Sequence, residues 1–239
     1  MILFECVSFR YHQNSKTSFS LKEVSFELQK GEVVGVIGSN GSGKSTAAKL
    51  ASGLIKPSSG RILVDGVNIS ESRISDSENK TIKLRAGIIF QNPENQIVGT
   101  TVEEDLAFGL ENLQVSNSEM RAKIESISKR FGLFELLKRP VHELSGGQKQ
   151  MLCIAGIIVM EPSWLIFDEP TAHLDPWSRR DFWVYVKEQC KEKNIGIIVI
   201  SQLPGDLDEF DRILVFSNGE LVFNDKSSLY VRPDFESIL

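Results

Sequence analysis

The chain has 239 residues, of which 41% are hydrophobic and 25% are charged, and its net charge at pH 7 is −5. This length and composition predict one domain or two small ones with a sizeable core, and they exclude a disordered or fibrous chain. The acidic balance argues against a nucleic-acid-binding protein, which would carry a basic face. The three cysteines lack metal-ligand spacing. Neither a signal peptide nor an apolar run of membrane-spanning length is evident, so we expect an intracellular chain with reduced thiols.

The N-terminal part predicts strands followed by a helix. Apolar and polar residues alternate over residues 2–10 and 24–28, and the polar residues 12–17 between them predict a turn. A short apolar run at residues 32–38 predicts a buried strand. Residues 45–53 favour a helix, which is expected to end at Gly53.

The middle of the chain, from Gln91 to about Met151, has helical character. Thr101 and Ser116 each begin a capping-box pattern, with glutamate three residues later. Apolar residues then recur every three or four positions, at Met120, Ile124, Ile127 and Phe131, which places them on one face of a helix. This part is expected to be a helical insertion in an α/β core.

The core is predicted to resume after this insertion. The continuous apolar runs at residues 164–167 and 195–200 are typical of buried parallel strands, and residues 85–91 predict another core strand. Two Asx-Gly pairs, Asp65-Gly66 and Asn218-Gly219, each predict the turn of a β-hairpin.

Residues 38–45 read Gly-Ser-Asn-Gly-Ser-Gly-Lys-Ser, which fits the phosphate-loop pattern G-x-x-x-x-G-K-[ST]. Glycine tolerates the backbone angles that let loop N–H groups surround a phosphate chain. Lys44 is expected to reach the β- and γ-phosphates, and the Ser45 hydroxyl is expected to ligate Mg²⁺. A strand before the loop and a helix after it would place the phosphates at a helix N-terminus. The pattern therefore predicts a nucleotide site, and the alternative is a chance Gly-Ser turn.

Leu144-Ser-Gly-Gly-Gln148 precedes a long predicted helix. Ser145 and Gln148 make a capping box, so an ordinary helix start is one interpretation. Gly146 and Gly147 are poor helix formers, at roughly 1 kcal/mol each relative to alanine. Their use would be to leave the helix N-terminus bare for a phosphate.

Two carboxylates, Asp168 and Glu169, end the apolar strand at residues 164–167. Asp168 fits a residue that holds Mg²⁺ through water, and Glu169 fits a general base that orients attacking water. The plainer alternative is a pair of solvated turn residues.

Together these motifs resemble the ATP-binding cassette (ABC) ATPases over essentially the whole chain. The resemblance implies an α/β fold with a P-loop NTPase (RecA-like) core of residues 1–90 and 155–239, including an N-terminal antiparallel β part. It implies an inserted α-helical subdomain at residues 91–154 that carries the signature motif. The expected activity is transport-coupled ATP hydrolysis with ATP and Mg²⁺, with two cassettes facing head to tail.

The resemblance also assigns roles to single residues. Tyr11 is similar to an aromatic that stacks on adenine, Gln91 to a glutamine that touches Mg²⁺ and water, and Asp175 to a residue of the dimer-interface loop. The implied catalytic residues are Glu169, Gln202, Gln91 and Lys44, and the implied Mg²⁺ ligands are Ser45, Gln91 and Asp168. The signature residues acting in trans are Ser145, Gly146, Gly147 and Gln148. The implied ATP-binding residues are Tyr11, Gly38, Ser39, Asn40, Gly41, Ser42, Gly43, Lys44, Ser45 and Thr46.

A narrower resemblance is to the cobalt-type, or energy-coupling factor (ECF), branch. It is carried by Phe90-Gln-Asn-Pro-Glu-Asn-Gln-Ile97, residues 101–109, Ala155-Gly-Ile157 and Met160-Glu-Pro162. The branch powers uptake of vitamins or of nickel or cobalt ions. It implies a second cassette chain, a transmembrane scaffold and a separate membrane substrate-binding protein, with this chain peripheral at the cytoplasmic face of the membrane.

The main departure from the family pattern is at one position of the candidate site. Where the family usually has a histidine at the γ-phosphate, this chain has Gln202, and glutamine can neither become cationic nor shuttle a proton. Either Gln202 is a weaker phosphate contact, or the chain's own site is slow while its signature motif serves a partner. A soluble, non-transport cassette protein is the other alternative, which the acidic balance and the single cassette disfavour.

Overall fold

The computed structural model describes most of the chain, namely residues 1–13, 16–70, 85–171 and 176–230. The chain divides into two compact units, one of residues 1–88 and 163–239 and one of residues 89–162. The division drawn from the sequence, at residues 91 and 154, stays a prediction.

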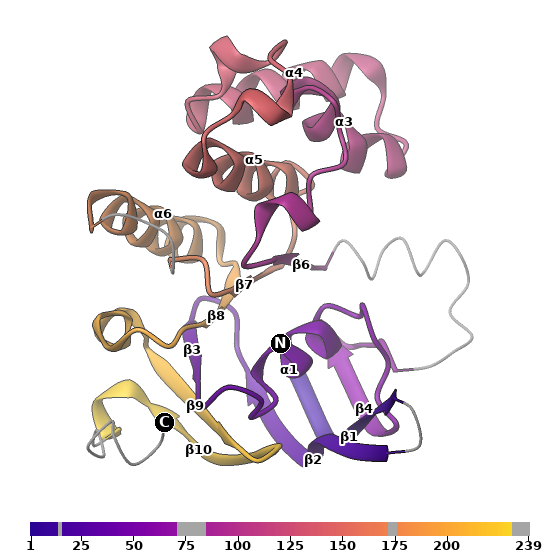
Figure 1. Ribbon diagram of the computed structural model, residues 1–239, viewed down its shortest axis with the longest axis vertical. Helices are drawn as coiled ribbons and strands as arrows, with labels where there is room; N and C mark the ends of the chain where they lie inside the picture. The colour runs from indigo at the N-terminus through magenta and orange to yellow at the C-terminus, as the bar shows by residue number, and fades with distance from the viewer. Residues whose placement is uncertain (14–15, 71–84, 172–175, 231–239) are drawn as a thin grey trace. The chain divides into compact units, whose positions relative to one another are not determined.

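The first unit begins with a four-stranded antiparallel sheet of order β2-β1-β4-β5 (Figure 1). Its strands are β1 (Ile2–Gln13), β2 (Lys16–Leu28), β4 (Ser59–Val64) and β5 (Val67–Asn68). The turn expected over residues 12–17 was too long, because β1 continues to Gln13 and β2 already begins at Lys16. β2 extends toward its N-terminus by pairing with β1, with Phe19 opposite Arg10 and Leu21 opposite Phe9.

A six-stranded sheet of order β10-β9-β3-β8-β7-β6 forms the rest of this unit's β structure (Figure 1). β3 pairs in parallel with β8 and β9, and β7 pairs in parallel with β8. The strands are β3 (Val33–Ile37), β6 (Ala86–Ile89), β7 (Trp164–Asp168), β8 (Gly196–Ile200), β9 (Arg212–Ser217) and β10 (Glu220–Lys226). Every residue of β3 and β8 is buried, as expected for parallel strands without alternation.

The described residues of this unit also form two helices and two short 3₁₀ turns. They are α1 (Lys44–Ala51), α6 (Pro176–Lys193), η4 (Pro204–Glu209) and η5 (Ser227–Leu229). α6 packs its Phe182 ring edge-on against Phe167 of β7, and Trp183 continues the aromatic cluster to Phe210. Gly35 in β3 makes room for that ring, because a Cβ there would lie 2.1 Å from Phe210 Cδ2. The core thus joins α6 to the centre of the sheet.

Both predicted hairpin turns are confirmed. Asp65-Gly66 joins β4 to β5, and Asn218-Gly219 joins β9 to β10. The φ angles are +49° and +79° in the first turn and +51° and +81° in the second. Positive φ at both central residues is the backbone that Asx-Gly turns favour.

The second unit is helical. It contains η1 (Pro93–Asn95), α3 (Val102–Asn112), α4 (Asn117–Arg130), η2 (Phe134–Leu136), η3 (Val141–Glu143) and α5 (Gly146–Ile158). The capping box of Thr101 with Glu104 is present, and Ser116 accepts from the backbone of Glu119 as the N-cap of α4. These helices follow β6 and precede β7 in the chain, and helices together with sheets of the predicted types confirm the expected α/β fold.

Candidate nucleotide site

Three parallel strands end together at one edge of the six-stranded sheet. Asp168 at the end of β7 and Val36 near the end of β3 each lie opposite Ile200, the last residue of β8. The loops after these strands carry the phosphate-loop pattern, Glu169 and Gln202. Open α/β sheets bind ligands outside the carboxyl ends of their strands. This edge is therefore the candidate nucleotide site.

The phosphate loop joins β3 to α1, and two of its glycines are required by both angle and space. Gly38 has φ +143°, and a Cβ there would lie 2.1 Å from the Phe216 carbonyl oxygen. Gly43, the N-cap of α1, has φ +111°, and a Cβ would lie 2.7 Å from Leu21 Cδ2. Side chains at either position would strain the loop. The loop thus leads directly into the N-terminus of α1, where backbone N–H groups favour an anion.

Lys44 lies inside this loop, with 5% of its surface exposed. Its Nζ donates to the carbonyl oxygens of Gly38 and Ser39, at 2.8 Å each. Burial lowers the pKa of Lys44, whereas the carboxylates of Glu169 and Asp168 raise it. The loop's own carbonyl groups therefore orient the ammonium, and preorganised charge of this kind is the main catalytic device in phosphoryl transfer.

Ser45 and Asp168 form a pair of oxygen ligands suited to magnesium. Ser45 Oγ donates to Asp168 Oδ1 at 3.2 Å. Burial raises the pKa of Asp168, the hydrogen bond from Ser45 opposes that rise, and the charge of Glu169 adds to it. A divalent cation would offset the electrostatic repulsion between the neighbouring carboxylates of Asp168 and Glu169. Mg²⁺ is commonly held by one or two carboxylates together with phosphates and water, so this donor set fits it.

Gln202 connects the phosphate loop to the expected general base. Its Nε2 donates to Glu169 Oε1 and also to Asn40 Oδ1, the latter at 3.0 Å. Glu169 itself has φ +53°, and its N–H donates to the Ile200 carbonyl at 3.0 Å. A non-glycine residue in this left-handed region is uncommon and is often found at functional sites. The structure therefore brings Glu169, Gln202 and the loop into one hydrogen-bonded group.

Tyr11 lies beside the first turn of α1. Its hydroxyl is 3.4 Å from Thr46 Oγ1, which in turn is 2.7 Å from Ser20 Oγ. Tyr11 is 39% exposed, and its ring packs edge-on against Phe9. An exposed aromatic face next to the phosphate-binding helix is suited to stacking on a base. Sequence reasoning missed Ser20, because its contact with Thr46 depends on the unpredicted N-terminal extension of β2.

The signature residues lie in the helical unit, at the start of α5. Ser145 is the N-cap and forms both bonds of a capping box with Gln148, at 2.9 and 3.3 Å. Gly146 and Gly147 follow, exposed, and a Cβ at either would meet no atom within 4 Å. The helix N-terminus is thus bare on its outer side, as a contact with a phosphate requires.

The structure does not place two other predicted residues, Gln91 and Asp175, at this edge of the sheet. Gln91 follows β6 at the beginning of the helical unit, so its expected contact with Mg²⁺ stays a prediction. Asp175 lies outside the described residues. Among the residues that the structure does describe, no helix is long and apolar enough to cross a membrane.

Comparison with known proteins assigns the family. The family model described as ABC transporter matches residues 21–172. The chain belongs to the ABC transporter family. It is an ABC-type ATPase subunit with the P-loop fold expected from its motifs, and its similarity to the ECF branch is confirmed by the relatives that follow.

Two curated relatives carry the name energy-coupling factor transporter ATP-binding protein EcfA1. The one from Clostridium perfringens is 43% identical over 225 residues, covering 93% of this chain and 78% of that protein. The one from Caldanaerobacter subterraneus is 41% identical over 219 residues, covering 91% and 78%.

Two solved structures share the fold. CbiO1 from Clostridium perfringens, part of the ABC transporter complex cbiONQ, has a TM-score of 0.82 at 34% identity and covers 95% of this chain and 88% of that one. The ATP-binding cassette MJ0796, dimeric in a post-hydrolysis state with ADP and Pi, has a TM-score of 0.85 at 25% identity, covering 95% and 99%.

Proposed function

We propose that this ABC ATPase binds and hydrolyses MgATP at the edge formed by β3, β7 and β8, and so energises ECF-type uptake of a vitamin or a transition-metal ion. The observation that carries the proposal is the group of Lys44, Ser45, Asp168 and Glu169 gathered at that edge. Each supplies a part that phosphoryl transfer from a nucleotide needs. The EcfA1 relatives support the ECF assignment.

Each residue has a separate task in this proposal. Lys44 and the N–H groups of the phosphate loop bind the β- and γ-phosphates, and the Tyr11 ring stacks on adenine. Ser45 and Asp168 would hold Mg²⁺, with Gln91 expected as a further ligand, and the ion would neutralise charge on the phosphates. Glu169 orients water for attack on the γ-phosphorus and accepts its proton.

The second half of the site is proposed to come from another cassette chain, either identical or different. The exposed glycines at the start of α5 would let its N-terminus approach the γ-phosphate bound by the partner. Supplying part of a site in trans is comparable to an arginine finger, worth about 10³ to 10⁵ in rate. MJ0796 is a dimer in its own structure, which supports this arrangement.

The proposal extends to membrane partners. As a peripheral subunit at the cytoplasmic face, the chain would pass the motion of dimer closure to a transmembrane scaffold through residues 91–113. A separate membrane protein would bind the transported substrate, so substrate specificity would lie outside this chain. The membership of CbiO1 in the cbiONQ complex supports a multi-protein assembly.

A second candidate function is a partner chain whose own site is slow. The observation that favours it is the bond from Gln202 Nε2 to Glu169 Oε1, which engages the carboxylate expected to accept a proton from water. A neutral amide cannot take over that proton, as a histidine could. In this case the chain's signature motif would serve the competent site of a different cassette.

Steady-state MgATP turnover tests these proposals. The native chain is compared with Glu169→Gln, first alone at high concentration and then in the membrane complex with which it copurifies. Turnover well above the Glu169→Gln value supports a working site. Native turnover equal to that value in the complex as well would refute hydrolysis at this site, and continued ATP binding would then favour the slow-partner function.

A further inference from the structure

One carboxylate in the first unit is fully buried and is used by none of the steps above. Asp206 lies in η4, and none of its surface is exposed. A buried carboxylate is costly unless hydrogen bonds replace the water that it loses. Three neutral donors do so here: the Thr171 hydroxyl at 2.8 Å, the Ser201 hydroxyl at 2.6 Å and the Trp183 indole N–H at 3.0 Å.

The two hydroxyl donors flank the candidate catalytic residues. Ser201 is the residue before Gln202, and Thr171 comes two residues after Glu169. Both hydroxyls donate to the same atom, Asp206 Oδ2. The chain segments after β7 and after β8 are therefore joined through a single carboxylate oxygen, just beyond the point where Glu169 and Gln202 meet.

The third donor attaches the carboxylate to α6. Trp183 belongs to α6, and its Nε1 donates to the other oxygen, Asp206 Oδ1. Its ring packs between Phe182 and Phe210. The Ser201 hydroxyl also accepts from the N–H of Leu203, at 3.1 Å, which ties down the backbone directly after Gln202. Hydrogen bonds to a charged acceptor are roughly twice as strong as neutral ones, so this cluster holds the two segments in one geometry.

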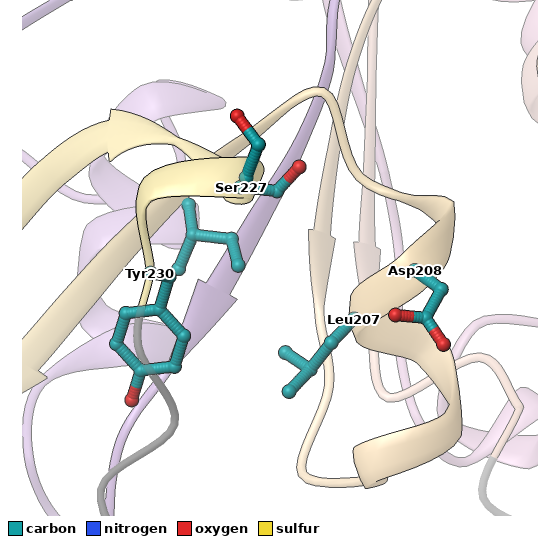
Figure 2. Close-up of a pocket in the computed structure, with 6 residues that line it drawn as sticks. Leu207, Asp208, Ser227 and Tyr230 are labelled. Atoms are coloured by element: carbon teal, nitrogen blue, oxygen red, sulfur yellow. The ribbon is translucent and has the colours of Figure 1, made fainter.

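The neighbouring residues of η4 face a different environment. A cavity of about 250 Å³ is lined by Leu207, Asp208, Ile213, Ser227, Ser228 and Tyr230. Figure 2 shows it close up. Asp208 is exposed there, whereas Asp206 is buried. η4 thus carries one buried and one exposed aspartate within three residues, so a substitution at Asp208 is a matched control for the Asp206 cluster.

We propose that Asp206 is a positioning residue for ATP hydrolysis, which sets the distance between Glu169 and Gln202 by holding the Thr171 and Ser201 hydroxyls on one oxygen. This positioning role rests on the proposed function, because Glu169 and Gln202 must act at the γ-phosphate for their spacing to matter. Misplacement of catalytic groups by about 1 Å can cost about 10²-fold in rate. A residue acting in this way affects the chemical step more than ATP binding, since Lys44 and the phosphate loop are untouched.

The test uses Thr171→Val and Thr171→Ser in the complete transport complex. Valine has nearly the shape of threonine but no hydroxyl, so we expect kcat to fall about tenfold or more with KM for MgATP changed by less than about twofold. Serine restores the donor and should restore most of kcat. Asp208→Asn is the control on the same turn and should leave both parameters at native values.

A purely structural role predicts a different pattern. Trp183→Phe removes the bond from α6 but neither hydroxyl, so it should lower the Tm at least as much as Thr171→Val while retaining most of kcat. If kcat instead follows the Tm across these variants, or if Thr171→Val hydrolyses ATP normally, the positioning role is overturned. Native turnover no higher than that of Glu169→Gln would overturn the proposed function together with this inference, and the two failures are thereby distinguished.

Discussion

The carboxamide of Gln202 donates from its Nε2 to Glu169 Oε1, and the same nitrogen donates to Asn40 Oδ1 at 3.0 Å. This relationship joins the segment after β8, the expected general base and the phosphate loop. It also shows how glutamine occupies a position where the family usually has a histidine. The amide has two N–H groups, and both are used in these bonds.

Gln202→His is expected to raise turnover. Imidazole can accept or donate a proton and can carry a positive charge near the γ-phosphate, whereas the amide can do neither. We expect kcat to increase about tenfold to a hundredfold, because one preorganised group is worth about 10² to 10³ in rate. Steady-state MgATP turnover measures the change, and Gln202→Ala is the comparison. An unchanged kcat in the histidine variant would mean that the amide already serves as well.

Ser45→Ala is expected to weaken the binding of magnesium at the site. Removing Oγ deletes one of the proposed Mg²⁺ ligands and the donor that lies 3.2 Å from Asp168 Oδ1. The Mg²⁺ concentration for half-maximal turnover should rise about tenfold or more, as an oxygen ligand is lost. Titration of turnover with Mg²⁺ at fixed ATP measures it. Ser52→Ala, at the other end of α1, is the control, and an equal shift in both variants would argue against a ligand role for Ser45.

Tyr11→Ala should weaken nucleotide binding. Stacking of a base on an aromatic ring is worth about 1–3 kcal/mol, so the Kd for ATP should rise about five- to 150-fold. Tyr11→Phe loses only the hydroxyl contact with Thr46 and should raise the Kd much less. Equilibrium binding of a fluorescent ATP analogue measures both. Equal Kd values for the alanine and phenylalanine variants would indicate that the ring does not contact adenine.

Gly147→Glu tests whether the start of α5 meets a phosphate in trans. A Cβ at Gly147 would meet no atom within 4 Å, and a carboxylate in the first turn favours the helix, so the fold should be kept. The negative charge would repel a phosphate, and turnover of the assembled dimer should fall about 10²-fold. ATP binding by the isolated variant should match the native chain. Gly147→Ala should lose less, and normal turnover in Gly147→Glu would contradict a role in trans.

Asp65 is expected to contribute a part of the folding stability that depends on pH. Burial alone would raise its pKa, but hydrogen bonds from the Met1 amino group, Lys30 and Trp164 outweigh burial and lower the pKa to about 2, from 3.8. The Met1 and Lys30 nitrogens lie 2.7 and 2.9 Å from the carboxylate. Because the folded-state pKa is depressed, this stability is present above the unfolded pKa and is lost as pH falls from about 3.8 toward 2.

After allowance for solvent screening, the contribution should be about 1–2 kcal/mol. Urea unfolding of the native chain and of Asp65→Asn, measured from pH 6 down to the lowest pH at which both fold, tests it. The difference in free energy of unfolding between the two should be constant above pH 5 and should narrow below pH 4. A constant difference throughout would show that the charge of Asp65 does not contribute.

Several elements could be predicted because their signals are local. The Asx-Gly pairs predict turns with positive φ at both residues, and both residues of each pair have positive φ in the structure. The phosphate loop has its strand before and its helix after it. Other elements could not be predicted in this way. In α6, Trp177 and Val184 are exposed whereas Phe182, Trp183 and Val186 are buried, so its described apolar residues do not mark a single face. The N-terminal half of β2 pairs with β1.

The sequence by itself determined which chemical groups this protein brings to ATP, because the phosphate loop, the signature motif and the Asp168-Glu169 pair are each contiguous in the chain. The tertiary structure decided how these groups meet. Ser45 reaches Asp168 from 123 positions away, and Gln202 reaches Asn40 from 162 positions away. Such distances close only when β3, β7 and β8 pair in parallel. The buried role of Asp206 arises in the same way, since its three donors converge only after α6 has packed on the sheet.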